Sequence, residues 1–134
     1  LTGAGESSTN GILADDTNSA LVLNGTTISG FATGVYKEGG TLSMIGDADL
    51  TGSDYAVYAD DVMVYAIDAS VDGGATGTGL HVVNSDDVWV YPMDASGLVG
   101  MYVENSPFRY KIFGAAKLAQ GYGQGSQGFL ASSL

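Results

Sequence analysis

A five-residue phrase that returns along the chain constrains this sequence more than any other feature. It reads Gly-Ile-Leu-Ala-Asp at 11–15 and returns, with substitutions, at 34–38, 56–60, 79–83 and 100–104. The five starts lie 21 to 23 residues apart. A unit of this length is too short to bury its own apolar face. Repeats of this kind therefore stack into a solenoid, in which each unit covers its neighbours.

Within each phrase, apolar residues alternate with period two, which is typical of a β-strand. The second residue of each phrase is predicted to point inward: Ile12, Val35, Val57, Leu80 and Met101. The third residue is predicted to point outward: Leu13, Tyr36, Tyr58, His81 and Tyr102. Lys37 interrupts the apolar pattern. Either its coil is distorted, or the lysine leans outward between layers, or it pairs with an acid.

The rest of each unit predicts two further short strands. Polar turn residues follow the phrase, and a second strand then offers pairs of inward residues: Leu21/Leu23, Leu42/Met44, Val62/Val64, Val88/Val90 and Phe108/Tyr110. A third, less regular strand is predicted to place these residues inward: Ile28, Leu50, Ile67, Met93 and Ile112. Three short strands per unit of about 22 residues describe one coil of a parallel β-helix.

The repeat resembles the right-handed parallel β-helix family, which includes pectate-lyase-like enzymes, viral tailspikes and autotransporter passenger domains. The resemblance covers about residues 11–113 and depends on the Gly-apolar-x-apolar register and on Asn84 and Asn105 at one corner. It implies an all-β solenoid of about five coils. It does not imply one function, because this fold carries several.

Composition excludes several classes of partner. The net charge of −11 argues against nucleic acid and against an anionic membrane surface, both of which attract basic proteins. The chain has no cysteine, and no apolar run is long enough to cross a membrane as a helix. Because it begins with Leu1, we expect a processed product or a fragment.

The sequence predicts one β-helix domain over residues 1–113, with residues 1–10 as an N-terminal arm or cap. Residues 114–134 are rich in Gly and Gln and end in an apolar tip. This composition fits a tail that docks on another surface, and it fits equally well a terminal segment that folds back as an end cap.

The outward column Tyr36, Tyr58, His81 and Tyr102 is the first candidate site. In-register stacking places these side chains about 4.8 Å apart. The column could stabilise its own sheet, contact another subunit, or bind sugar rings.

A second outward column is predicted on the second strand: Val22, Ser43, Met63, Trp89 and Arg109. Apolar residues in one exposed column indicate a covered surface. We therefore predict a subunit interface formed by both columns and the tail: Val22, Met63, Trp89, Tyr36, Tyr58, His81, Tyr102, Phe129, Leu130 and Leu134.

Carboxylates gather at the corner after each phrase: Asp15, Asp16, Glu38, Asp60, Asp61, Asp86, Asp87 and Glu104. Turn chemistry favours Asp at such places, and the calcium-binding nonapeptide is missing. We expect neither a metal nor a cofactor. Catalysis is also not expected, because Arg109 and Lys111 are the only basic residues that lie close together and the loops are too short to enclose a substrate.

These patterns predict a structural, non-enzymatic subunit of a self-assembling filament, sheath, surface layer or spike. We expect it to form a homo-oligomer or polymer, and to lie outside the cell, on the cell surface or on a virion. The alternative is a module that binds or cleaves glycans, with a cell-surface glycan as its partner.

Overall fold

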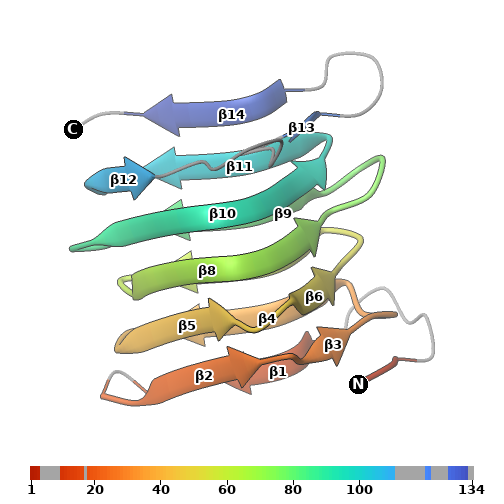
Figure 1. The fold of residues 1–134 in the computed structure, drawn as a ribbon, viewed down its shortest axis with the longest axis horizontal. Helices are drawn as coiled ribbons and strands as arrows, with labels where there is room; N and C mark the ends of the chain where they lie inside the picture. The colour runs from red at the N-terminus through yellow and green to blue at the C-terminus, as the bar shows by residue number, and fades with distance from the viewer. Residues whose placement is uncertain (4–9, 17, 111–119, 122–126, 133–134) are drawn as a thin grey trace.

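The computed structural model describes residues 1–3, 10–16, 18–110, 120–121 and 127–132. As predicted, the described chain is an all-β parallel solenoid, and it contains no helix (Figure 1). It makes about four turns, slightly fewer than the five coils expected. Strands stack in layers from β1 and β2 at one end to β14 at the other, and every pair of neighbouring strands is parallel.

The repeated phrases form the first, six-stranded sheet. Its strands follow one another in the order β1 (Asn10–Ala14), β4 (Thr33–Glu38), β7 (Tyr55–Asp60), β9 (Thr78–Val83), β11 (Val99–Glu104) and β14 (Gln127–Ser132). One register runs through the sheet and aligns Ile12, Val35, Val57, Leu80, Met101 and Phe129. The C-terminal tail thus adds a strand to the chain's own sheet.

The second and third strands of each turn form the other sheet. It contains β2 (Ala20–Asn24), β3 (Thr27–Ile28), β5 (Thr41–Ile45), β6 (Ala48–Thr51), β8 (Met63–Asp72), β10 (Val88–Gly97), β12 (Phe108–Tyr110) and β13 (Gln120–Gly121). The two strands are separate in the first two turns, as predicted. In the next two turns they merge into the ten-residue strands β8 and β10.

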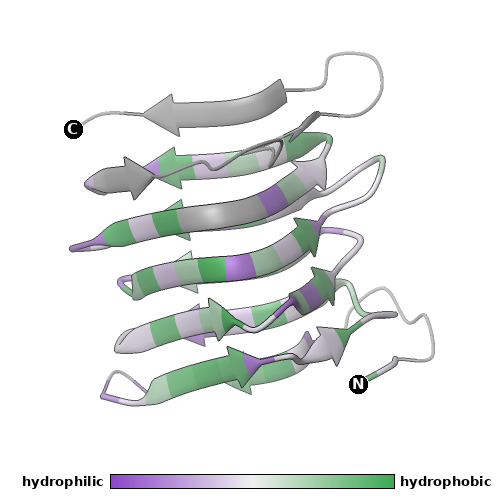
Figure 2. Ribbon diagram, viewed as in Figure 1, coloured by the Kyte–Doolittle hydropathy of each residue, from purple (hydrophilic) through white to green (hydrophobic). Residues whose placement is uncertain are grey.

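The core lies between the sheets and is built from three aligned apolar columns. Val35, Val57, Leu80 and Met101 are fully buried, which confirms the inward column of the repeated phrase. Leu42, Val64 and Val88 form the second column, and Ile28, Leu50 and Val71 form the third. Figure 2 shows hydrophobic residues returning at matching places in successive layers.

In the third turn, one predicted inward residue is buried at a different place and another is exposed. In the third turn, Leu42 and Met44 align with Val64 and Ala66 rather than with Val62 and Val64. Val62 is buried instead in the corner that precedes the strand. Ile67 is 40% exposed, and Val71 takes the inward place in the third column. The backbone turns at Asp68, where φ is 64°, so the strand's alternation is re-set after Ile67.

The corner between the two sheets repeats a left-handed residue in each turn. Gly39, Asp61, Asn84 and Asn105 have φ values of 70°, 59°, 56° and 53°. Gly, Asn and Asp are the residues that tolerate this conformation best. The amide of Gly39 donates to Asp60 O at 3.0 Å, and the amide of Asp61 donates to Val83 O at 3.0 Å. The turn residues therefore continue the interlayer hydrogen bonding around the corner.

The glycine that opens four of the five phrases marks a tight edge of the solenoid. A Cβ on Gly79 would lie 2.5 Å from Gly100 O and 2.6 Å from Ser96 O. Both contacts are with backbone atoms, which cannot move without breaking the ladder. This edge brings the end of one sheet against the start of the other, so packing requires glycine at position 79, whereas the third phrase accommodates Ala56.

Truncating a residue of the inward column should destabilise the fold far more than truncating an outward one. Leu80→Ala should lower the free energy of unfolding by about 2–5 kcal/mol, because Leu80 is fully buried at mid-stack. Ile67→Ala, at a 40% exposed position, should cost less than about 1 kcal/mol. Urea denaturation of both variants checks this, and equal losses would contradict the register.

Candidate functional site

Four aromatic side chains form a continuous ladder on the outer face of the first sheet. Tyr36 stacks on Tyr58 with ring centroids 5.1 Å apart and planes 1° from parallel. His81 stacks on Tyr58 at 4.8 Å and on Tyr102 at 4.7 Å. The predicted spacing of about 4.8 Å is confirmed. Tyr55 adds edge-on contacts to Tyr58 and His81, which sequence reasoning missed.

The ladder uses most of its ring faces internally. Parallel rings whose centroids lie 4.7–5.1 Å apart can only be stacked, since coplanar rings at this distance would overlap. Each inner ring therefore covers the faces of its neighbours and presents its edge to the outside. A sugar ring binds best on an uncovered aromatic face. The arrangement is better suited to stiffening the sheet and to contacts through the ring edges than to binding a sugar.

Carboxylates two residues further along accept hydrogen bonds from the ladder. The hydroxyl of Tyr102 donates to Glu104 Oε2 at 2.9 Å, and that of Tyr36 donates to Glu38 Oε1. The bond to Glu38, together with burial, raises the pKa of Tyr36 to about 12. The bond to Glu104 raises the pKa of Tyr102 in the same way. These pairs orient the phenol rings and occupy two of the corner carboxylates.

Side-chain amides bridge the acidic corner. Asn105 Nδ2 donates to Asn84 Oδ1 at 2.8 Å, and Asn84 Nδ2 donates to Asp60 Oδ1 at 3.1 Å. Asn84 and Asn105 thus lie together, as expected. Val83 interrupts the carboxylate column between Asp60 and Glu104. Among the described residues, no three His, Asp or Glu side chains gather as possible metal ligands.

Lys37 stays inside the solenoid, contrary to the expectations of a distorted coil or an outward lean. It is fully buried and remains in register with Ala14 and Ala59, whose small side chains leave it room. Its Nζ donates to the backbone oxygen of Gly39, to Ser19 Oγ at 3.0 Å and to Asp16 O at 3.3 Å. Hydrogen bonds to these oxygens offset the cost of burying the ammonium group.

The second candidate surface is broader than the predicted column. Val22 and Ser43 align with Tyr65 and Trp89, so the predicted place of Met63 in this column is wrong. Met63 lies two residues earlier on the same face of β8, beside Thr41. The shift follows from the third-turn register corrected above.

The corrected register gathers apolar and aromatic residues on this face, with Ser43 between Val22 and Tyr65. Met63, Tyr65 and Ile67 occupy alternate positions of β8, so they share its outer face, and the Tyr65 hydroxyl lies 4.0 Å from Met63 Sδ. Neighbouring strands add Val22, Ile45 and Trp89 at aligned positions. We call the following residues the lateral patch: Val22, Ile45, Met63, Tyr65, Ile67 and Trp89. The alternation of β8 could have revealed it, had the strand start been placed correctly.

The tail residues of the predicted interface fall at the C-terminal end of the first sheet. The backbone of β14 aligns Phe129 with Met101 and Leu130 with Tyr102. Leu134 lies outside the described residues, as do Lys111 and Ile112. The backbone pairing favours the end-cap interpretation of the tail over docking on another molecule.

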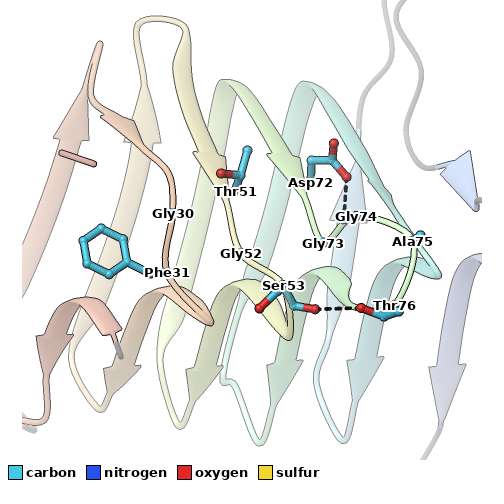
Figure 3. Close-up of a pocket in the computed structure, with 10 residues that line it drawn as sticks. All are labelled: Gly30, Phe31, Thr51, Gly52, Ser53, Asp72, Gly73, Gly74, Ala75 and Thr76. Atoms are coloured by element: carbon cyan, nitrogen blue, oxygen red, sulfur yellow. Dashed lines mark hydrogen bonds between the residues drawn. The ribbon is translucent and has the colours of Figure 1, made fainter. Parts of the chain in front are cut away.

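A shallow hollow of about 370 Å³ lies at the edge where the third strand of each turn ends. Figure 3 shows Phe31 at one end and the loop from Asp72 to Thr76 at the other. The Asp72 carboxylate accepts the amide of Gly74 at 2.8 Å, and the Thr76 hydroxyl donates to Ser53 O at 3.3 Å. These polar groups serve the loop, and glycine backbone supplies much of the lining, so the hollow lacks convergent groups for a ligand.

The chain matches no protein-family model, no curated protein and no solved structure. Within the described residues, no helix is long and apolar enough to span a membrane.

The ladder predicts a pH-dependent contribution to stability from His81. Burial lowers the pKa of its imidazole, with Glu104 and Asp60 opposing the shift. Because the folded pKa lies below the unfolded value of about 6.5, the contribution is complete above that value. It is lost as the pH falls through the folded pKa.

The control is His81→Phe, which keeps a ring between Tyr58 and Tyr102. Urea denaturation of both proteins between about pH 7.5 and about pH 5 measures the effect. The stability of the parent relative to His81→Phe should fall as the pH falls. A difference that is constant or rises would contradict the prediction.

Proposed function

We propose that this protein is a structural, non-catalytic subunit that assembles with copies of itself. The lateral patch carries the proposal. It places six apolar or aromatic residues on one sheet face, and Val22, Ile67 and Met63 are 57%, 40% and 37% exposed. Contiguous patches of this kind are rare on monomers and mark interaction surfaces.

The form of the patch suits contact between subunits. Tyr, Trp and Met are enriched in interfaces, and all three occur here. Most of the side chains stand on β5, β8 and β10, which are paired on both sides, so little backbone freedom remains to be lost on association. A flat face also allows the same contact to repeat along a rod, as a filament, sheath, surface layer or spike requires.

The aromatic ladder supports the same function from the other sheet. Stacked rings stiffen the face, and the tyrosine hydroxyls with their carboxylate partners form a polar rim. We therefore still predict a second, more polar subunit contact, formed by Tyr36, Tyr58, His81 and Tyr102. An extracellular, cell-surface or virion-surface setting belongs to this proposal, since assemblies of these types work there.

Glycan binding or cleavage is the alternative, and the geometry supports it less. The ladder covers the ring faces that a sugar would use, and the hollow at the glycine edge offers few free polar groups. A saccharide-induced rise in melting temperature of a monomeric protein would favour this alternative.

A charge placed in the lateral patch should prevent lateral assembly. Ile67→Lys leaves the core untouched but puts an ammonium group into the contact, where losing its water is costly. We expect association to weaken by at least about 30-fold, which corresponds to about 2 kcal/mol at a central interface residue. Sedimentation velocity and electron microscopy compare the variant with the parent.

The matched control is Thr27→Lys, which adds the same charge to an exposed position of the second sheet outside the patch. It should assemble as the parent does. The proposed function fails if the parent remains a monomer at high concentration. The role of the patch fails if Ile67→Lys assembles as well as Thr27→Lys.

A further inference from the structure

The two end strands of the first sheet each have one neighbour among the described residues, and neither carries a charge. In the described part of the chain, β1 pairs only with β4, and β14 pairs only with β11. Their sequences, Asn-Gly-Ile-Leu-Ala and Gln-Gly-Phe-Leu-Ala-Ser, contain no charged residue and no proline. Proteins usually protect free edge strands with charges, proline or bulges. These two strands have neither charge nor proline.

The apolar groups of β1 are also less covered than those of the strands above it. Leu13 is 60% exposed. Ile12 is half-buried, whereas Val35 and Val57 in the same column are fully buried. The inward column thus continues into the end of the solenoid, where Ile12 is only partly covered.

Resting on the proposed function, we propose that a second copy of this chain covers β1 with its β14. The two edges are the opposite ends of one parallel sheet with one register. A strand that pairs with β14 as β14 pairs with β11 would place Leu13 of the next copy on Leu130, and Ile12 on Phe129. The aligned inward and outward columns would then run on from one molecule to the next.

The chain's first residues leave room for this contact. Thr2 bridges Ser29, the residue directly after β3, and the amide of Ser29 donates to Leu1 O at 2.8 Å. Residues 1–3 therefore occupy the third-strand position of the layer beyond β1. β14 occupies the first-strand position of the last layer, so the two segments would share a layer without competing. The second-strand position of that layer holds no described strand, so the contact depends on the first sheet.

The symmetry of the contact determines its product. A head-to-tail contact uses two different surfaces, so each added copy offers a new β14 or a new β1 edge. The product is an open filament along the solenoid axis. Two β1 edges meeting each other would instead close into a dimer.

Disulfide trapping tests the contact, because the natural chain has no cysteine. In a Leu13→Cys/Leu130→Cys variant, five strand spacings separate the two positions within one molecule, about 24 Å. A disulfide needs Cα atoms within about 7 Å, so a bond can form only between molecules. Oxidation should give a ladder of covalent dimers, trimers and longer chains on a non-reducing gel.

The matched control is Thr27→Cys/Leu130→Cys, whose first position is exposed on the other sheet and lies outside the lateral patch. It should give no ladder. Leu13→Lys should weaken association by at least about tenfold, because a charge protects an edge strand, whereas Thr27→Lys should leave this end contact unchanged.

The outcomes separate this inference from the proposed function. Dimers formed as readily by Leu13→Cys alone would show that β1 edges meet each other, which overturns the head-to-tail contact. A parent that polymerises while the Leu13→Cys/Leu130→Cys variant gives no ladder also overturns it and leaves lateral assembly in place. A parent that stays monomeric overturns both.

Discussion

Each inner strand of this molecule completes its backbone hydrogen bonds through the strands one layer above and below it. A single unit has neither an apolar interior nor a closed ladder, so stability depends on parallel, in-register stacking. A shift by one residue would turn every inward side chain of a strand outward. The apolar columns, the aromatic ladder, the left-handed corner and the glycine edge are therefore four consequences of one register. A change of register would therefore disrupt all four.

The register was predictable from the sequence where the period is strict. The prediction failed where corners intervene. The repeated phrase correctly placed Val57 and Leu80 inward and the aromatic column outward, because it contains no irregular residue. The second strand of the third turn starts after a longer corner than expected, which moved Met63 out of its column and Tyr65 into it. Beyond Asp68, period-two counting fails because a residue with φ of 64° re-sets the alternation.

Lys37 and the tail are two features whose placement the sequence pattern does not predict. Charge alone predicts an outward lysine, whereas volume explains its burial: Ala14 and Ala59 in the neighbouring layers leave space for the long stem. The oxygens that hold its ammonium group come from corners 16–19 and 39, which only the folded chain brings together. For the tail, composition allows docking on any sheet edge. Its in-register pairing with β11 is a property of the three-dimensional structure.

The two proposed contacts would respond differently to charge, and this difference would determine the shape of the assembly. The end contact joins two strands without charged residues, whereas the net charge of −11 opposes any approach of one rod to the side of another. Repulsion between exposed charges is screened over about 10 Å at 0.1 M salt and over about 30 Å at 0.01 M. At low ionic strength the end contact would be favoured, and single filaments would result. At higher ionic strength the lateral patches could meet as well, because screening would leave their apolar burial as the dominant free energy. Filaments would then associate side by side, so salt would act on the width of the assembly more than on its length.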